Sequence, residues 1–220
     1  MFRSTSTIVA FAFSTVIASA NAFHLNPDQS WTSNMATFGS TSIPIGYYEY
    51  CQRYGERCNR TAEGSSVRLT PERWKAIISV NFEVNTSVTP KTDREIFGVE
   101  ERWVYPDGVG DCEDYALLKR KILNEQVGIP LGALSMTVGR DASGGGHAVL
   151  TVITDRGDFI LDNVEPRVLS WQEAEIRFLK RQSSMDPNVW VSLVREGAPR
   201  EPSGYASSQA SSIAATKLRK

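Results

Sequence analysis

Short strand-like runs separated by turn-forming links constrain the fold of this chain more than any other feature. The runs cover residues 131–138, 147–154 and 159–162, and they are rich in β-branched and other apolar residues. DRGD at residues 155–158 carries a glycine and is typical of a hairpin turn, while GRDASGGG at residues 139–146 is a flexible link. Because a hairpin makes its two strands antiparallel, this region is predicted to form an antiparallel sheet.

Helical patterns precede the strands. Thr70 is a suitable N-cap before Pro71, and apolar residues at helical spacing predict a helix that runs to about residue 88. A second helix is expected over residues 111–127, with Lys119 interrupting its apolar face, and residues 89–110 are expected to be a loop. A short helix is expected to begin at Ser170, and residues 189–194 form a last predicted strand. Helices followed by an antiparallel sheet predict an α+β domain.

The N-terminus has the pattern of a secretory signal peptide. Arg3 precedes an apolar stretch at residues 8–17, and Ala20 and Ala22 form an A-x-A cleavage site. A membrane anchor is the alternative, but the apolar stretch is shorter than the roughly 18 residues that a spanning helix needs. The sequence therefore predicts cleavage near Ala22 and a periplasmic or secreted protein.

The remaining sequence divides into an arm, one domain and a tail. Residues 23–45 are rich in polar residues and proline and are expected to be an N-terminal arm, partly packed through apolar residues such as Met35. Residues 46–195 form the predicted domain, and residues 196–220 are expected to be a disordered C-terminal tail. The formal net charge of −1 gives no electrostatic footprint for nucleic acid, so no nucleic-acid partner is expected.

An exported chain places its cysteines in an oxidising compartment. Cys51 and Cys58 are close together in YCQRYGERC, so we expect a disulfide between them, with two separate buried thiols as the alternative. Cys112 is then the odd cysteine. In such a compartment an unpaired thiol tends to have a function.

Cys112, His147 and Asp162 are the candidates for catalysis. Cys112 lies at the head of the second predicted helix, whose positive end stabilises a thiolate. His147 begins one predicted strand and Asp162 ends the next, so a hairpin would make them neighbours. A nucleophile, a base and an orienting carboxylate are the components of a thiol hydrolase. The acids Asp111 and Glu113 beside Cys112 oppose this chemistry, because negative charge raises a thiol pKa.

GDCEDYALLK, GGGHAVLTV and ILDN, in this order, resemble the bacterial transglutaminase-like cysteine peptidases. These are exported members of the papain-like and transglutaminase-like superfamily, and the resemblance covers roughly residues 43–195. It implies an α+β fold in which the nucleophile begins a helix that packs on an antiparallel sheet. It also implies a triad with Cys112 as nucleophile, His147 as general base and acid, and Asp162 as the orienting residue.

The resemblance bears on metal and partners as well. Some members are calcium-dependent periplasmic proteases that cut surface adhesins, and Asp111 and Glu113 match the acids associated with the ion. It therefore implies Ca²⁺ beside a triad that needs no cofactor for its chemistry, a protein substrate such as an adhesin, and an inner-membrane regulatory receptor. The alternatives are a transamidase or amidase of the same fold, and a non-catalytic calcium-binding regulatory module.

Overall fold

The computed structural model describes residues 33–59, 65–195 and 197. The predicted signal peptide, residues 23–32 of the predicted arm and nearly all of the predicted tail lie outside the described residues. Within the described ranges, no helix combines the length and the apolar character needed to cross a membrane.

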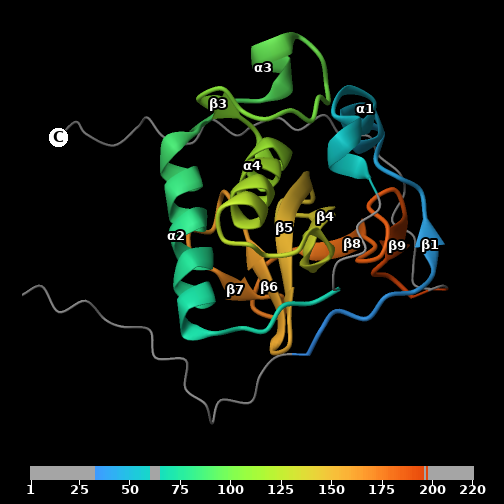
Figure 1. The fold of residues 1–220 in the computed structure, drawn as a ribbon. Coiled ribbons are helices and arrows are strands. Elements are labelled where there is room, and N and C mark those ends of the chain that lie inside the picture. Colours follow the sequence, from blue (N-terminus) through green and yellow to red (C-terminus); the bar gives the residue numbers. More distant parts are fainter. Residues whose placement is uncertain (1–32, 60–64, 196, 198–220) are drawn as a thin grey trace, which may run out of the picture.

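A seven-stranded sheet forms the centre of the fold, and all of its pairings are antiparallel (Figure 1). Its strand order is β1-β9-β8-β4-β5-β6-β7. The strands are β1 (Ser40–Thr41), β4 (Leu134–Arg140), β5 (Gly146–Thr154), β6 (Gly157–Leu161), β7 (Leu169–Ser170), β8 (Arg177–Gln182) and β9 (Trp190–Ser192). The predicted α+β class with an antiparallel sheet is confirmed.

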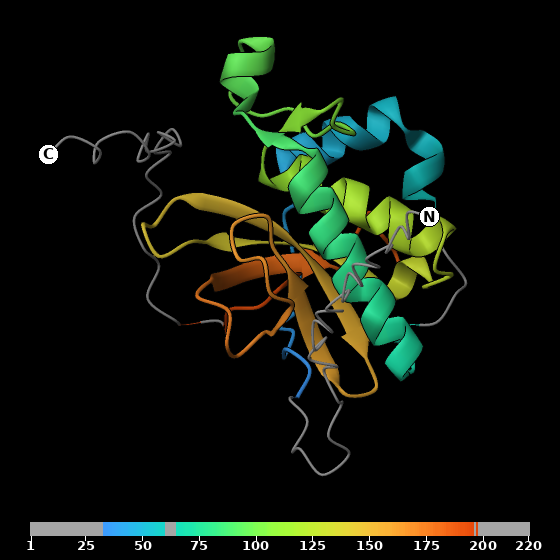
Figure 2. The same cartoon turned by 90° about the vertical axis from the view of Figure 1, so that its left-hand side faces the viewer.

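Helices α2 (Pro71–Ser87) and α4 (Cys112–Glu125) lie on one side of this sheet (Figure 2). Helix α2 begins as expected, because the Thr70 side chain accepts a hydrogen bond from the amide of Arg73. Tyr47 of helix α1 (Ile45–Arg53) packs against Trp190 of β9, and 3₁₀ turns occupy Gly55–Cys58 and Leu131–Ala133. Helices α2 and α4 therefore pack on the antiparallel sheet, as predicted (Figure 2).

Two local predictions are wrong. The expected loop at residues 89–110 contains helix α3 (Asp93–Phe97) and a parallel pair, β2 (Thr89–Pro90) with β3 (Val109–Gly110). Helix α3 begins there because Thr92 and Glu95 form a reciprocal capping box. The expected helix at Ser170 is a single turn, in which the Glu173 carboxylate accepts from the amide and hydroxyl of Ser170.

Alternation along the strands divides the apolar residues between two faces. Ala148 and Leu150 of β5 belong to the main core beneath α2 and α4. Val149 faces the other way and packs with Ile160 and with Met35 from the predicted arm. The described part of the arm therefore covers the sheet face opposite the helices.

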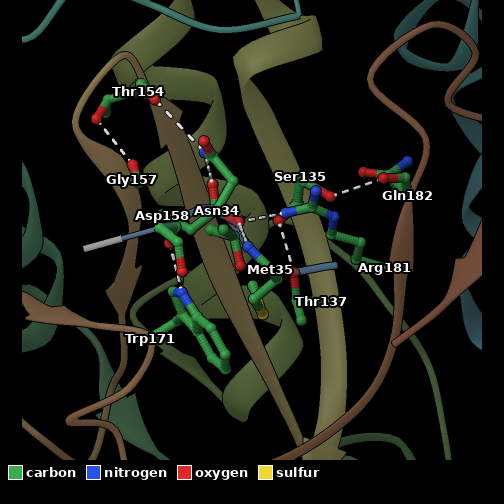
Figure 3. A network of polar contacts seen from close by, with 12 residues as sticks. Asn34, Met35, Ser135, Thr137, Thr154, Gly157, Asp158, Trp171, Arg181 and Gln182 are labelled. Carbon is green, nitrogen blue, oxygen red and sulfur yellow. Dashed lines mark hydrogen bonds and ion pairs between the residues drawn. The ribbon is translucent and has the colours of Figure 1, made fainter. Parts of the chain in front are cut away.

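Asp158 is the centre of a buried polar network on that opposite face (Figure 3). Its carboxylate accepts from Asn34 Nδ2 at 2.6 Å and from the Met35 amide at 2.8 Å, and it pairs with Arg181 at 2.7 Å. Asp158 is fully buried and Arg181 is nearly so. This network attaches the arm to strands β6 and β8.

The disulfide between Cys51 and Cys58 is present, with a Cα–Cα distance of 5.7 Å. It links the end of α1 to the 3₁₀ turn that follows it. Among the described residues, Cys112 is the free cysteine.

Candidate active site

Cys112 is the first residue of α4 and lies directly beside strand β5. Its Sγ accepts a hydrogen bond from the amide of Ala148, 3.4 Å away, which places the thiol next to the residue that follows His147. Asp111 is the N-cap, and its backbone is extended, so the helix begins at Cys112. Gly110 permits a tight approach, since a Cβ there would lie 2.8 Å from Asp114 Oδ2.

The local electrostatics oppose a thiolate at Cys112. Burial, followed by the charges of Glu113 and Asp111, raises the pKa of the Cys112 thiol well above its ordinary value. The thiol also donates to Glu113 Oε2 at 3.3 Å, so the carboxylate holds the protonated form. The amide of Ala148 acts in the opposite direction by donating to the sulfur.

His147 and Asp162 form a direct pair. His147 Nε2 lies 2.8 Å from Asp162 Oδ1, and both side chains are largely buried. Burial alone would raise the pKa of Asp162, but the hydrogen bond and charge of His147 and the amide of Val164 bring it below its ordinary value. Because Nε2 contacts Asp162, Nδ1 is the ring nitrogen of His147 that remains for another partner. The structure thus pairs His147 with Asp162 and places the Cys112 thiol against the backbone of Ala148, the residue after His147.

Two further side chains hold the backbone of Asp162. Its carbonyl oxygen accepts from Lys119 Nζ at 2.9 Å and from Asn85 Nδ2 at 2.8 Å. Lys119 is fully buried on α4, and burial lowers its pKa to about 7 although the charge of Asp162 acts in the opposite direction. Asn81, one turn before Asn85 on α2, donates to the Pro166 carbonyl at 2.9 Å. Both helices therefore clamp the loop that begins with Asp162.

A group of carboxylates lies beside Cys112. Oxygen atoms of Asp93, Asp111 and Glu113 lie within 4.8 Å of one another. Within the described ranges, none of the ion pairs joins these acids to lysine or arginine. The structure brings the two predicted calcium ligands together with Asp93, which the sequence analysis did not identify.

Burial and mutual repulsion raise the pKa of the carboxyl groups in this cluster. Burial, then the charge of Asp111, raises the pKa of Asp93 to about 6. Burial, then Asp111 and Glu101, raises the pKa of Glu113 well above its ordinary value. Asp93 Oδ1 and Asp111 Oδ1 are buried without a hydrogen-bond partner among the described residues. Hard oxygen ligands with unsatisfied charge fit a calcium ion.

Three contributors to the site escaped the sequence analysis. Asp93 lies in a segment expected to be a loop, and only its capping box, Thr92 with Glu95, signals the short helix that orients it. Lys119 was visible as a charge on an otherwise apolar helix face, which is a signal for a buried functional contact. Asn85 carries no local signal, because its role depends on the packing of α2 against the loop after β6.

A cysteine at the start of a helix, beside a histidine–aspartate pair on an antiparallel sheet, defines a thiol hydrolase of α+β architecture. The chain belongs to the family of bacterial transglutaminase-like cysteine proteinases (BTLCP), which matches residues 37–198. It is therefore a transglutaminase-like cysteine peptidase, as the motifs indicated.

LapG from Legionella pneumophila is among the solved structures to which this chain is similar. The calcium-bound form is 23% identical, covers 67% of this chain and 88% of its own, and gives a TM-score of 0.43. The EGTA-treated form is 22% identical over 68% of this chain and 84% of its own, with a TM-score of 0.42. A transglutaminase structure is 15% identical over 61% and 43% of the two chains, with a TM-score of 0.28. Comparison with curated proteins gave no match.

Proposed function

We propose that this chain is an exported peptidase that hydrolyses a protein substrate through a thioester on Cys112. The observation that carries the proposal is the contact between His147 Nε2 and Asp162 Oδ1 beside a thiol at a helix N-terminus. Asp162 fixes the ring so that Nδ1 is available to the thiol, and its negative charge stabilises the imidazolium.

In the acylation half of the reaction, Cys112 Sγ attacks the scissile carbonyl carbon and the thiol proton passes to His147. The amide of Cys112 is in the first turn of α4, where amides have no acceptor within the helix, and it can donate to the oxyanion. His147 then gives its proton to the departing amine as the C–N bond breaks, which leaves the thioester.

In the second half, His147 removes a proton from water, and the resulting hydroxide attacks the thioester carbonyl. The C–S bond breaks, the sulfur regains a proton from His147, and the new carboxylic acid leaves. His147 therefore acts alternately as base and acid, while Asp162 keeps its ring in one orientation.

Calcium is the second part of the proposal. Asp93, Asp111 and Glu113 are the residues that would hold the ion. A bound cation supplies positive charge that offsets the carboxylates raising the pKa of Cys112, and so favours the thiolate. The protein's own contribution is the arrangement of these acids at the N-terminus of α4.

Removal of one candidate ligand is expected to weaken calcium binding by about tenfold or more, because each carboxylate supplies both charge and an oxygen atom. The measurement is calorimetric titration of calcium into wild type, Asp93→Ala and Asp111→Ala. Asp107→Ala is the matched control, since Asp107 is an exposed acid in the loop just before the site. Equal affinities in all four proteins would contradict the metal assignment.

Lys119 is expected to act as a positioning residue for the triad. Lys119→Met keeps the length and packing of the side chain but removes the hydrogen bond to the Asp162 carbonyl. A small displacement of a catalytic group lowers turnover more than substrate binding, so kcat should fall by about tenfold with KM little changed. Lys121→Met on the same helix is the control. A Lys119→Met variant with wild-type kcat and normal unfolding would contradict a positioning role for Lys119.

The cellular role is proposed from the resemblance and from the N-terminal sequence. The peptidase is exported after cleavage near Ala22, acts on a surface protein such as an adhesin, and is regulated by an inner-membrane receptor. Secreted and surface proteins should be compared between bacteria with the wild-type gene and with Cys112→Ala. A large surface protein should be released only by the wild type, whereas identical cleavage patterns would contradict an adhesin substrate.

A further inference from the structure

A groove with a volume of about 460 Å³ lies against the histidine–aspartate pair. Its walls come from the β4–β5 link at residues 141–143, the loop at residues 162–167 and the turn at residues 173–176. His147 and Asp162 both line it. We call the groove that these residues line the His-side groove.

The chemistry of the reaction indicates which part of a substrate this groove faces. During acylation the acyl part stays on Cys112 Sγ, while the departing amine must lie within reach of the proton on His147. His147 and Asp162 line the groove, and Cys112 is not among its lining residues. The groove therefore faces the part of the substrate that follows the scissile bond.

The lining residue from β6 shows which face of the sheet the groove follows. On β6, Ile160 belongs to the sheet face opposite the helices and also forms part of the groove. The groove thus extends from the His147–Asp162 pair along the sheet face that carries Ile160.

The lining of the groove combines an apolar floor with an acidic rim. Ile160, Leu169 and Ile176 supply apolar surface, and Asp141, Glu165, Glu173 and Glu175 supply carboxylates. Among the described lining residues, the basic side chain is that of Arg167, and its guanidinium is paired with the Glu165 carboxylate at 2.9 Å.

Hydrogen bonds hold two of the other rim acids, Glu173 and Asp141. Glu173 accepts from the Ser170 hydroxyl at 2.6 Å, and Asp141 accepts from the Ser143 hydroxyl at 2.6 Å and from the Gly145 amide at 2.9 Å. These donors are neutral, so they orient the carboxylates without cancelling them. Hydrogen bonds from Ser143 and Gly145 keep the pKa of Asp141 below its ordinary value, although burial acts against them.

We infer that the His-side groove binds the polypeptide segment that follows the scissile bond, and that it prefers a segment with a basic side chain flanked by small or apolar residues. The inference rests on the proposed function. The apolar floor accepts the flanking residues, and the acidic rim attracts the cation while it disfavours an acidic segment.

Acyl transfer to matched amines tests this inference without knowledge of the natural substrate. p-Nitrophenyl acetate would acylate Cys112 with loss of nitrophenolate. The amine of glycyl-lysyl-alanine amide, or of its leucyl or glutamyl counterpart, then competes with water. The amine attacks the acyl carbon, the C–S bond breaks, and the amine's proton passes through His147 to the sulfur. The ratio of amide to acetate reports how well each amine occupies the groove.

The lysyl peptide is expected to exceed the glutamyl peptide by about fivefold to tenfold in this ratio, the scale of a few partly exposed charge contacts. Glu175→Lys should remove or invert the preference, whereas Glu49→Lys on α1 changes the net charge equally outside the groove and should retain it. Raising the salt concentration should reduce the lysyl advantage in the wild type without any substitution.

The possible failures are distinguishable. Equal ratios for the three peptides in an enzyme that is acylated would overturn the inference and leave the proposed peptidase intact. A charge preference that persists in Glu175→Lys and at high salt would also overturn it. Absence of any acylation of Cys112 would instead contradict the proposed function itself.

Discussion

Replacing Cys112 with alanine is expected to abolish peptide-bond cleavage, with a loss in kcat of at least ~10⁴-fold and up to the ~10⁶-fold scale of triad nucleophiles. The reason is that no other group can form the thioester at this position. His147 and Asp162 would remain paired, but they would have no thiol to deprotonate. The measurement is turnover of a protein or peptide substrate by the purified variant with calcium present.

The control for this variant is its stability. Cys112 is the first residue of α4 and is half-buried, so its replacement loses little burial and the alanine variant should unfold close to the wild-type midpoint. His147→Ala should lose activity on a comparable scale, since the pair acts as a unit. Measurable wild-type turnover in a folded Cys112→Ala protein would contradict nucleophilic catalysis by this residue.

Replacing Asp158 with alanine is expected to have the largest effect on stability, a loss of about 3–5 kcal/mol in the free energy of unfolding. The substitution leaves the guanidinium of Arg181 buried without its partner. It also removes the acceptor of Asn34 Nδ2 and of the Met35 amide, which attach the arm to the sheet (Figure 3). Urea unfolding monitored by tryptophan fluorescence measures the change.

Two comparisons show whether the buried charge is the cause. Glu100→Ala removes an exposed ion pair with Arg94 and should cost less than about 1 kcal/mol. The double substitution Asp158→Leu with Arg181→Met removes both buried charges and should cost less than Asp158→Ala alone. A loss in Asp158→Ala no larger than that in Glu100→Ala would contradict the role of this network.

Local sequence patterns predicted the elements that have strong local signals. The hairpin of β5 and β6 follows from two apolar runs around a glycine turn, and α2 follows from Thr70 and Pro71. Strand β8 was missed because RFLKRQ has no alternation, since Arg181 faces the buried network. Three of the two-residue strands, β1, β2 and β3, depend on pairing with distant segments, and no window of sequence contains that information.

The candidate site shows the same division. Cys112, His147 and Asp162 could be chosen because a helix start and a hairpin place them by simple geometry. Asp93 and Asn85 could not, because each reaches the site through tertiary packing of an element whose own sequence is unremarkable there. The acids beside Cys112 looked unfavourable in the sequence, and in the structure burial and these charges raise the pKa of the Cys112 thiol and of the Glu113 carboxyl, which supports the proposed calcium site.

The most direct test of the central claim is the rate at which an iodoacetamide probe alkylates Cys112 at neutral pH with calcium present. The account predicts that wild-type Cys112 is labelled, as located by mass spectrometry of the peptide that contains it. It also predicts that His147→Ala slows labelling by about tenfold or more, because the imidazolium that stabilises the thiolate is gone. Wild-type Cys112 that stays unlabelled, or that reacts at the same rate without His147, would contradict the account.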